Sequence, residues 1–378
     1  FAPTVELHKL LRENTKDDTE YKRYMDAMKQ SVLTAFYTPP EITGTIADVL
    51  HKHGIRPDRV LEPSAGVGAF VDAVLADIMA FEKDLMTGKI LRHLHSDQKV
   101  RIQGYEKIEK PFMNHFDLAI SNIPFGDVAV FDPEFTNSHD VARRSASKTI
   151  HNYFFLKSLD AVREGGIVAF ITSQGVLDAP TNAPIREYMM NHANLVGVAR
   201  LPNNLFTENA GTEVGSDLII LQKNSGKNGE LYYNEKLFVQ TEQTPIGTSV
   251  NGYVWSIGSL SHTDLTKSTD PYGKPAYKLM HRGDTVQLAE DLREHLKIEL
   301  HQLNRELYER HSLHPTQTES TDKSMNVEVQ PSPKVEAVTS TANVFITEAE
   351  KPKVQPIDEK PEIEPRQTNH SNAVQLTL

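Results

Sequence analysis

The spacing of apolar residues along the chain predicts an α/β protein. Between Val60 and about Lys223, apolar runs of strand length alternate with helical patterns, which is typical of a parallel sheet flanked by helices. The runs are RVLEPS, DIMAFE, KVRIQGYE, FDLAISN, GIVAFITS, NLVGVARL and SDLIILQK. We therefore expect these runs to be the strands of one sheet.

The regions outside this sheet have other patterns. Residues 1–34 carry apolar spacings that predict amphipathic helices packed on a core. Residues 224–310 combine turn residues, a strand-like LYYNEKLFVQ and, from about Thr285 to Tyr308, a charged helix with one leucine stripe. Residues 311–378 have almost no aromatics, which predicts a disordered linker or tail. The expected division is 1–34, a catalytic domain at 35–223, 224–310 and 311–378.

Composition excludes several kinds of site. The chain has 378 residues and no cysteine, so it has no disulfide, no thiolate metal site and no cysteine nucleophile, and we expect no metal. No apolar stretch approaches the roughly 20 residues that span a bilayer, so we expect a cytoplasmic protein without a membrane partner. The net charge of -11 means that nucleic acid must meet a local basic patch. The chain starts at Phe1 and ends in a polar tail, so the question whether it is a fragment of a longer protein stays open.

The segment LEPSAGVGAF predicts a strand, a tight turn and a helix that begins near Phe70. Glycines at 66 and 68 let the backbone approach a ligand closely. The segment lacks the third glycine of a dinucleotide fingerprint, and its acid, Glu62, precedes the turn, which suits a sulfonium cofactor better than a pyrophosphate. A strand-turn-helix without a ligand is the alternative.

Two further acids follow candidate strands. Glu82 ends DIMAFE and could accept both ribose hydroxyls of a nucleoside cofactor, and Glu106 follows KVRIQGY, from where it could bind the cofactor's adenine amine. The alternative for Glu82 is the solvated face of one long helix from Ala69 to Leu94, and the alternative for Glu106 is a surface carboxylate.

The tetrapeptide Asn122–Phe125, or NIPF, directly follows the strand FDLAIS. An aromatic amine is a poor nucleophile, because its lone pair is delocalised into the ring. The Asn122 side-chain oxygen and the Ile123 carbonyl could accept its hydrogens, while Phe125 offers a face for a base taken out of the stack. An ordinary strand-to-loop turn is the alternative.

Two more segments complete the candidate site. AFYTPPEI has an aromatic pair and two prolines, which suit a rigid loop over a ligand, although Thr38 could also be a plain helix cap. The loop after the tetrapeptide carries Arg143, Arg144 and Lys148, which could hold phosphates beside a flipped base or could simply be solvated.

Together these segments resemble the amino-group DNA methyltransferases of the N6-adenine type, in order and in spacing. AFYTPPEI resembles their cofactor-closing motif, LEPSAGVGAF their glycine motif and SNIPFGD their catalytic Asn-Pro-Pro-aromatic motif, with Ile123 at the usual first proline. That exchange removes a fixed φ and is expected to loosen the turn. HNYFFLKSLDAVREGGIVAFITSQG, RLPNNLF and GTEVGSDLIILQK resemble the methylase region of large methylase-helicase proteins of bacterial mobile elements.

The resemblance covers about residues 1–310 and implies a Rossmann-like sheet that binds S-adenosylmethionine and methylates adenine N6 in DNA. It also implies a helicase-like region of the same longer chain as a partner, and a role in restriction-modification. The residues that it implies for the cofactor are Tyr37, Thr38, Pro39, Glu62, Ala65, Gly66, Gly68, Glu82 and Glu106, and those for the target base are Asn122, Ile123, Pro124 and Phe125.

Three other functions stay open at this point. The same Asn-Pro-aromatic geometry methylates glutamine side chains in proteins, and a silent DNA-binding module of a helicase-like protein would keep the fold without the activity. The incomplete glycine pattern disfavours a nicotinamide oxidoreductase. The recognition sequence is expected to be read outside the residues that carry these motifs.

Overall fold

A computed structural model of the chain describes residues 9–25, 38–207, 213–269, 273 and 275–313. The predicted helical pattern near the amino terminus is confirmed where it is described, at residues 9–14 and 18–25. In this segment Leu10 is 50% exposed and Met25 is buried, and the packing of the segment on a core stays a prediction. Residues 311–313 are described and the rest of the predicted tail lies outside the described residues.

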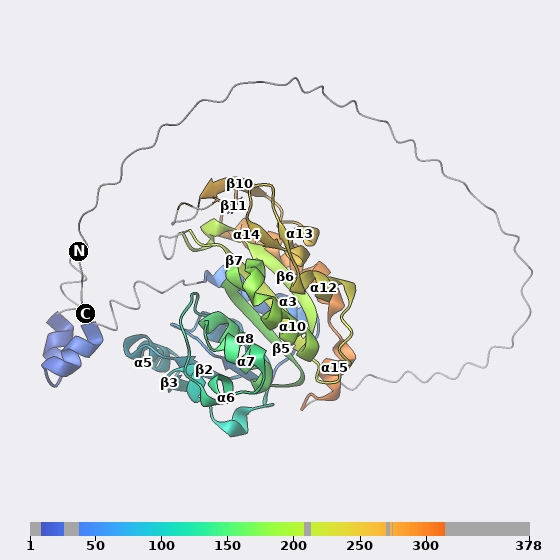
Figure 1. Cartoon of the computed structure of the whole chain (residues 1–378). Coiled ribbons are helices and arrows are strands. Elements are labelled where there is room, and N and C mark those ends of the chain that lie inside the picture. Colours follow the sequence, from blue (N-terminus) through green and yellow to red (C-terminus); the bar gives the residue numbers. More distant parts are fainter. Residues whose placement is uncertain (1–8, 26–37, 208–212, 270–272, 274, 314–378) are drawn as a thin grey trace, which may run out of the picture. The chain divides into compact units, whose positions relative to one another are not determined.

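One seven-stranded sheet forms the centre of the fold, in the order β3-β2-β1-β4-β5-β7-β6 (Figure 1). The first five strands in that order are parallel neighbours, and β7 runs antiparallel to both β5 and β6. All seven apolar runs are strands: β1 (Arg59–Glu62), β2 (Asp77–Glu82), β3 (Lys99–Ile102), β4 (Phe116–Asn122), β5 (Val162–Ser173), β6 (Ala193–Leu201) and β7 (Ser216–Lys223). The predicted Rossmann-like α/β sheet flanked by helices is confirmed.

Helices cover both faces of this sheet, because nearly continuous apolar strands expose a hydrophobic surface on each side. On one face the core includes residues of α3 (Pro40–Lys52), α4 (Ala69–Ala73), α5 (Leu85–Leu94), α14 (Thr285–Glu299) and α15 (Arg305–Arg310). On the other face, with α8 and α10 in front of the sheet in Figure 1, it includes residues of α6 (Pro133–Thr136), α7 (Val141–Ala146), α8 (Ile150–Ala161), α9 (Gly175–Asp178), α10 (Ala183–His192), α12 (Tyr233–Val239) and α13 (Gly252–Ile257).

Short elements connect these layers. Single 3-10 turns are η1 (Tyr105–Lys107), η2 (Lys110–Phe112), η3 (Pro180–Asn182), η4 (Asn203–Phe206) and η5 (Leu300–Gln302). Two small antiparallel hairpins pair β8 (Thr241–Gln243) with β9 (Ser249–Asn251) and β10 (Thr263–Thr269) with β11 (Pro275–His281).

Two secondary-structure predictions were wrong. LYYNEKLFVQ is the helix α12 rather than a strand, because the Glu235 carboxylate accepts the Tyr232 N–H at 3.0 Å and stabilises a helix start there. The leucine stripe after Thr285 is two helices, because Asn304 caps α15 by accepting the Leu307 N–H at 3.0 Å. The stripe packs on α3 and β6 through α14.

No helix among the described residues is both long and apolar enough to cross a membrane. The proposed boundaries between the four segments of the chain stay a prediction.

Candidate active site

The last residues of three neighbouring parallel strands meet at one cavity. Glu62 ends β1, Glu82 ends β2 and Asn122 ends β4, and the strand order reverses between β1 and β4. Such a reversal opens a crevice at the carboxyl edge of a sheet, where ligands bind in open α/β folds. The cavity has a volume of about 760 Å³, and nine of the predicted site residues line it: Thr38, Glu62, Ala65, Gly66, Glu82, Glu106, Asn122, Ile123 and Pro124.

Glu62 is a buried carboxylate at the floor of this cavity. Its residue surface is 2% exposed, and its Oε2 has no hydrogen-bond partner among the described residues. Burial raises the pKa of Glu62 well above its ordinary value, and the nearby Glu82 and Asp72 carboxylates raise it further, while amides at the start of α4 lower it. A buried acceptor of this kind fits a ligand that brings a positive charge or a donor.

Glu82 holds the glycine turn against the end of β2. Its Oε2 accepts the Gly66 N–H at 3.0 Å, and its Oε1 accepts the Asp84 N–H at 2.7 Å. Burial raises the pKa of Glu82. The alternative of one long helix from 69 to 94 is excluded, because β2 separates α4 from α5.

The two glycines of the turn have different surroundings. Gly66 lines the cavity and has φ of 57°, in the left-handed region that glycine tolerates. Gly68, with φ of 101°, does not line it, and a Cβ there would lie 2.5 Å from His95 Nε2. Gly68 therefore allows α4 to start close to α5, and its predicted contact with a cofactor stays a prediction.

The segment before α3 reaches the end of β4. Asn122 Nδ2 donates to the Thr38 hydroxyl at 3.1 Å, and the Thr38 side chain is buried. Pro39 does not line the cavity, and its carbonyl accepts the Ile42 N–H at 3.0 Å as α3 begins. Both predictions for Thr38 fit this position, because it precedes a helix and also borders the cavity. Tyr37 lies outside the described residues.

Ile123 is anchored where a loosened turn was expected. Its side chain is 1% exposed in the apolar core, and its N–H donates to the Ile171 carbonyl at 3.0 Å. A proline could not make that bond. Packing and a hydrogen bond to β5 therefore fix this turn in place of a locked φ.

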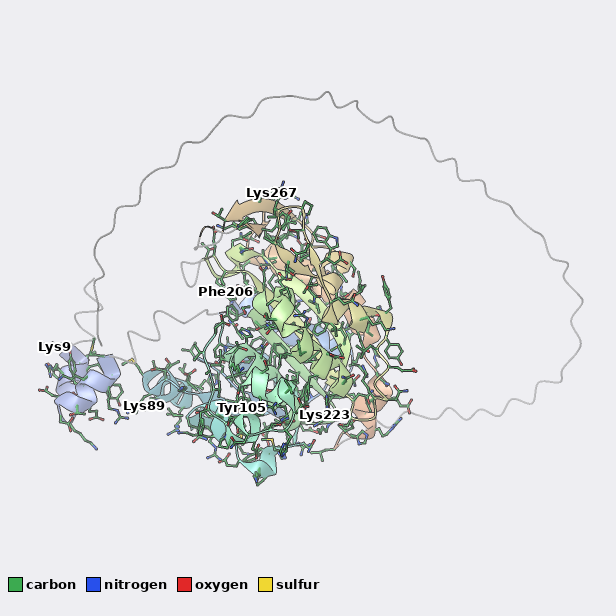
Figure 2. All side chains as sticks on the ribbon, in the orientation of Figure 1. Lys9, Lys89, Tyr105, Phe206, Lys223 and Lys267 are labelled. Atoms are coloured by element: carbon green, nitrogen blue, oxygen red, sulfur yellow. The ribbon has the colours of Figure 1, made fainter. Side chains whose placement is uncertain are left out.

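Phe125 lies beside the cavity rather than in its wall. The ring is partly buried against the apolar core and meets Phe206 of η4 edge to face, with centroids 6.4 Å apart. Figure 2 labels Phe206 and also Tyr105, which marks the start of η1 at the cavity.

Glu106 of η1, which follows β3, adds a third carboxylate to the lining of the cavity. Its carboxylate folds over Gly104, where an added Cβ would come within 2.2 Å of Oε2. The residue is half-buried and lines the cavity, so it is not an ordinary surface carboxylate.

The three basic residues of the following loop have different surroundings, and none of them lines the cavity. Arg143 binds Asp160 at 2.8 Å and donates to the Tyr188 hydroxyl at 3.3 Å. Arg144 and Lys148 are exposed. Arg143, by contrast, is partly buried. A phosphate contact by any of the three residues stays a prediction.

Phe131 is a cavity residue that was not predicted from the sequence. It lines the cavity and is 79% exposed, and Val128 beside it is 58% exposed. Such exposure is unusual for apolar side chains next to a cavity. The signal was the apolar run VAVF, two residues after the tetrapeptide, which belongs to no strand or helix.

Comparison with known proteins finds relatives of part of the chain. The sequence model of the N-6 DNA Methylase family matches residues 86–249, which include Asn122 and Phe125 but neither Glu62 nor Glu82. The chain is 27% identical over 202 residues to Defense against restriction protein B of Escherichia phage P1, and this match covers 52% of the chain and 9% of that protein. It is 24% identical over 194 residues to the Type II methyltransferase M.XamI of Xanthomonas campestris pv. amaranthicola, covering 44% of the chain and 34% of that protein.

Among solved structures, a modification subunit of a putative type I restriction enzyme from Vibrio vulnificus is 15% identical, with a TM-score of 0.43, and the match covers 65% of this chain and 63% of that one. The match to the two curated relatives spans only a minor part of their length. The match to the N-6 DNA Methylase family covers residues 86–249, which is less than half of the chain.

Proposed function

We propose that the chain binds S-adenosylmethionine in the cavity at the ends of β1, β2 and β4 and transfers its methyl group to N6 of adenine in DNA. The observation that carries this proposal is the convergence of Glu62, an unsatisfied buried acid, and Asn122, the residue of the methylase tetrapeptide, on one cavity.

The cofactor would be held by the acidic side of the cavity. Glu62 would neutralise positive charge on the cofactor, the Gly66 turn would allow close backbone approach, and Glu82 and Glu106 would accept hydrogen bonds from the ribose and adenine. When bound, S-adenosylmethionine supplies an electrophilic methyl group. Pro39, Gly68 and Tyr37 are assigned to the same cofactor by resemblance only.

The target amine would be oriented by Asn122 and Ile123. The bond from Asn122 Nδ2 to Thr38 fixes the orientation of the side-chain amide. The other atom of that amide, Oδ1, would be the acceptor for the target amine. With the Ile123 carbonyl it would accept the two amine hydrogens and localise the nitrogen lone pair. Phe125 would support the flipped base, with Pro124 shaping the turn. The amine proton leaves after transfer, so no strong general base is required.

DNA would be held beside this pocket by the loop that contains α7. Arg144 and Lys148 are the exposed cations there, while Arg143 would act mainly by anchoring the loop through Asp160. A net charge of -11 makes such a local patch necessary. We further propose that recognition of the target sequence, and any helicase-like activity, belong to other parts of a longer protein.

The decisive experiment is the Asn122→Ala variant. Methyl transfer to unmethylated DNA, measured with tritiated cofactor, is expected to fall by about 10²–10³-fold or more, as when a preorganised transition-state contact is removed. Calorimetric affinity for S-adenosylmethionine should stay within a few fold, because the side chain contacts the target. Asn228→Ala, at an exposed asparagine, is the matched control and should change neither quantity.

Other outcomes would contradict the proposal. Equal loss of binding and transfer would remove Asn122 from the target side of the site. Tritium in a protein acceptor but not in DNA would favour glutamine methylation, and no cofactor binding at millimolar concentration would favour a silent module.

A further inference from the structure

A second polar cluster lies outside the proposed methyltransferase site. His262 precedes β10, His281 ends β11 and Asp291 lies on α14. Their ligand atoms all lie within 4.8 Å of one another, the only such histidine and carboxylate group among the described residues. We propose that this cluster is a binding site for a divalent transition metal, with Zn²⁺ as the fitting ion.

The donor atoms converge on one point. Asp291 Oδ2 lies 2.8 Å from His262 Nδ1 and 2.9 Å from His281 Nε2. Zn²⁺ binds histidine nitrogen and carboxylate oxygen at about 2.0–2.2 Å, so the ligands of a tetrahedral site lie roughly 3.3 Å apart. Movements of under about an ångström would therefore admit the ion. Imidazole and carboxylate without thiolate suit Zn²⁺ better than Mg²⁺ or Ca²⁺.

The surroundings orient one ligand as a metal site requires and leave a second one to change its tautomer. Gln287 Nε2 donates to Asp291 Oδ1 at 3.1 Å, which leaves Oδ2 pointing at the histidines. His281 Nδ1 accepts the Gly283 N–H at 3.0 Å and lies 3.3 Å from the Gly283 carbonyl. Metal binding through Nε2 would therefore move the ring proton to Nδ1, where the carbonyl would accept it in place of the present bond. Asp291 and His281 are buried and His262 is half-exposed, so an ion could enter from one side and keep a water as fourth ligand.

The backbone at His262 supports a directed side chain. Its φ of 53° lies in the left-handed region, which among the described non-glycine residues only Asn114 shares. The conformation is held because the Arg282 N–H donates to the His262 carbonyl at 2.9 Å. In this conformation the imidazole Nδ1 lies 2.8 Å from Asp291 Oδ2.

A bound ion would join two parts of the fold that also contact a third. It would link the β10–β11 hairpin, on which Figure 2 labels Lys267, to α14. The His281 N–H also donates to Asn204 of η4 at 3.0 Å, and η4 carries Phe206, which meets Phe125. The metal would thus stabilise the packing of the hairpin and α14 next to η4, and it would take no part in the methyl transfer itself.

The test compares the full chain with His262→Ala, whose half-exposed side chain can be removed without opening the core. The metal-free proteins are titrated with Zn²⁺ by calorimetry and followed by thermal unfolding, and with Co²⁺ by visible absorption. The proposal expects one site in the unsubstituted chain, a raised Tm, Co²⁺ ligand-field bands, and a loss of affinity of more than about tenfold in His262→Ala. His93→Ala, at an exposed histidine of α5, is the control and should behave like the unsubstituted chain.

Asp291→Asn is a second test of the metal site, since it keeps the shape of the side chain but removes the anionic ligand. Equal Zn²⁺ affinity in the unsubstituted chain, His262→Ala and His93→Ala would overturn the proposal, and so would Co²⁺ binding without ligand-field bands. The cluster would then be only a hydrogen-bonded link between the hairpin and α14.

Discussion

Two buried carboxylates on adjacent strands, β1 and β4, have opposite surroundings. Asp117 near the amino end of β4 is 1% exposed, and it accepts from Arg163 Nε at 2.5 Å and from the Arg59 N–H at 2.9 Å. Glu62 at the carboxyl end of β1 is equally buried, but its Oε2 has no partner among the described residues. The same sheet therefore satisfies one buried charge and leaves the other open.

The hydrogen-bond partners of the two carboxylates distinguish a structural role for Asp117 from a ligand-binding role for Glu62. A buried carboxylate whose oxygens are bonded fixes its neighbours, and here Asp117 joins β1, β4 and β5. An unsatisfied buried acceptor costs about 1–3 kcal/mol of folding free energy. Such a cost is expected where a ligand later satisfies the group, at the edge of the sheet that carries the cavity.

Asp117→Ala should have the largest effect, and it should act on stability. The substitution leaves the Arg163 guanidinium and two backbone amides buried without their acceptor, which typically costs about 3–5 kcal/mol. Denaturant unfolding measures this loss. Glu306→Ala, which removes an exposed ion pair with Arg310, is the control and should change stability by less than about 1 kcal/mol. A similar small change for Asp117→Ala would refute the structural role.

Glu62→Gln should have the opposite effect on stability. The cofactor-free protein is expected to become more stable at neutral pH, because an amide replaces an acid that is costly to ionise in place. Affinity for S-adenosylmethionine should fall by about tenfold or more, the value of one charge-assisted contact. Calorimetry and thermal unfolding measure the two changes. Glu230→Gln, at an exposed acid that does not line the cavity, is the control and should leave both quantities unchanged.

Stability and cofactor affinity should depend on pH in opposite directions, because both involve the protonation of Glu62. The native pKa of Glu62 is raised, so between the ordinary value and the raised one the folded protein holds a proton that the unfolded chain has lost. The free energy of unfolding therefore falls as pH rises through that window. Cofactor affinity should rise with pH over the same window, because the ionised form binds the cation. Glu62→Gln should remove most of both slopes, and Glu82, whose pKa is raised in the same direction, should account for what remains.

The sequence predicted the sheet because its strands are buried on both faces and read as continuous apolar runs. It also predicted that Glu62, Glu82 and Asn122 would be neighbours, since the ends of parallel strands share one edge. The predicted single helix after Thr285 is interrupted between Glu299 and Arg305, where the Asn304 cap of α15 outweighs a regular leucine spacing.

Features that depend on long-range contacts could not be predicted. The anchoring of Ile123 requires β5 beside β4, and the bonds that satisfy Asp117 come from residues 46 and 58 positions away. His262, His281 and Asp291 have no recognised spacing, because a hairpin and a helix bring them together. An exposed Phe131 has no periodic pattern that would separate it from a core residue.

Phe131→Ala should have the smallest effect, because it tests the open rim of the cavity rather than its buried floor. The ring is 79% exposed, so a bound nucleoside would bury only part of it, and we expect affinity for S-adenosylmethionine to fall about three- to tenfold. Stability should not change, since the side chain packs little in the cofactor-free protein. Phe131→Tyr should retain the affinity, and Leu75→Ala, at a side chain that is 98% exposed and does not line the cavity, should leave it unchanged. A loss of stability in Phe131→Ala, or equal affinities in all three variants, would mean that the rim does not contact the cofactor and that binding rests on the acids of the floor.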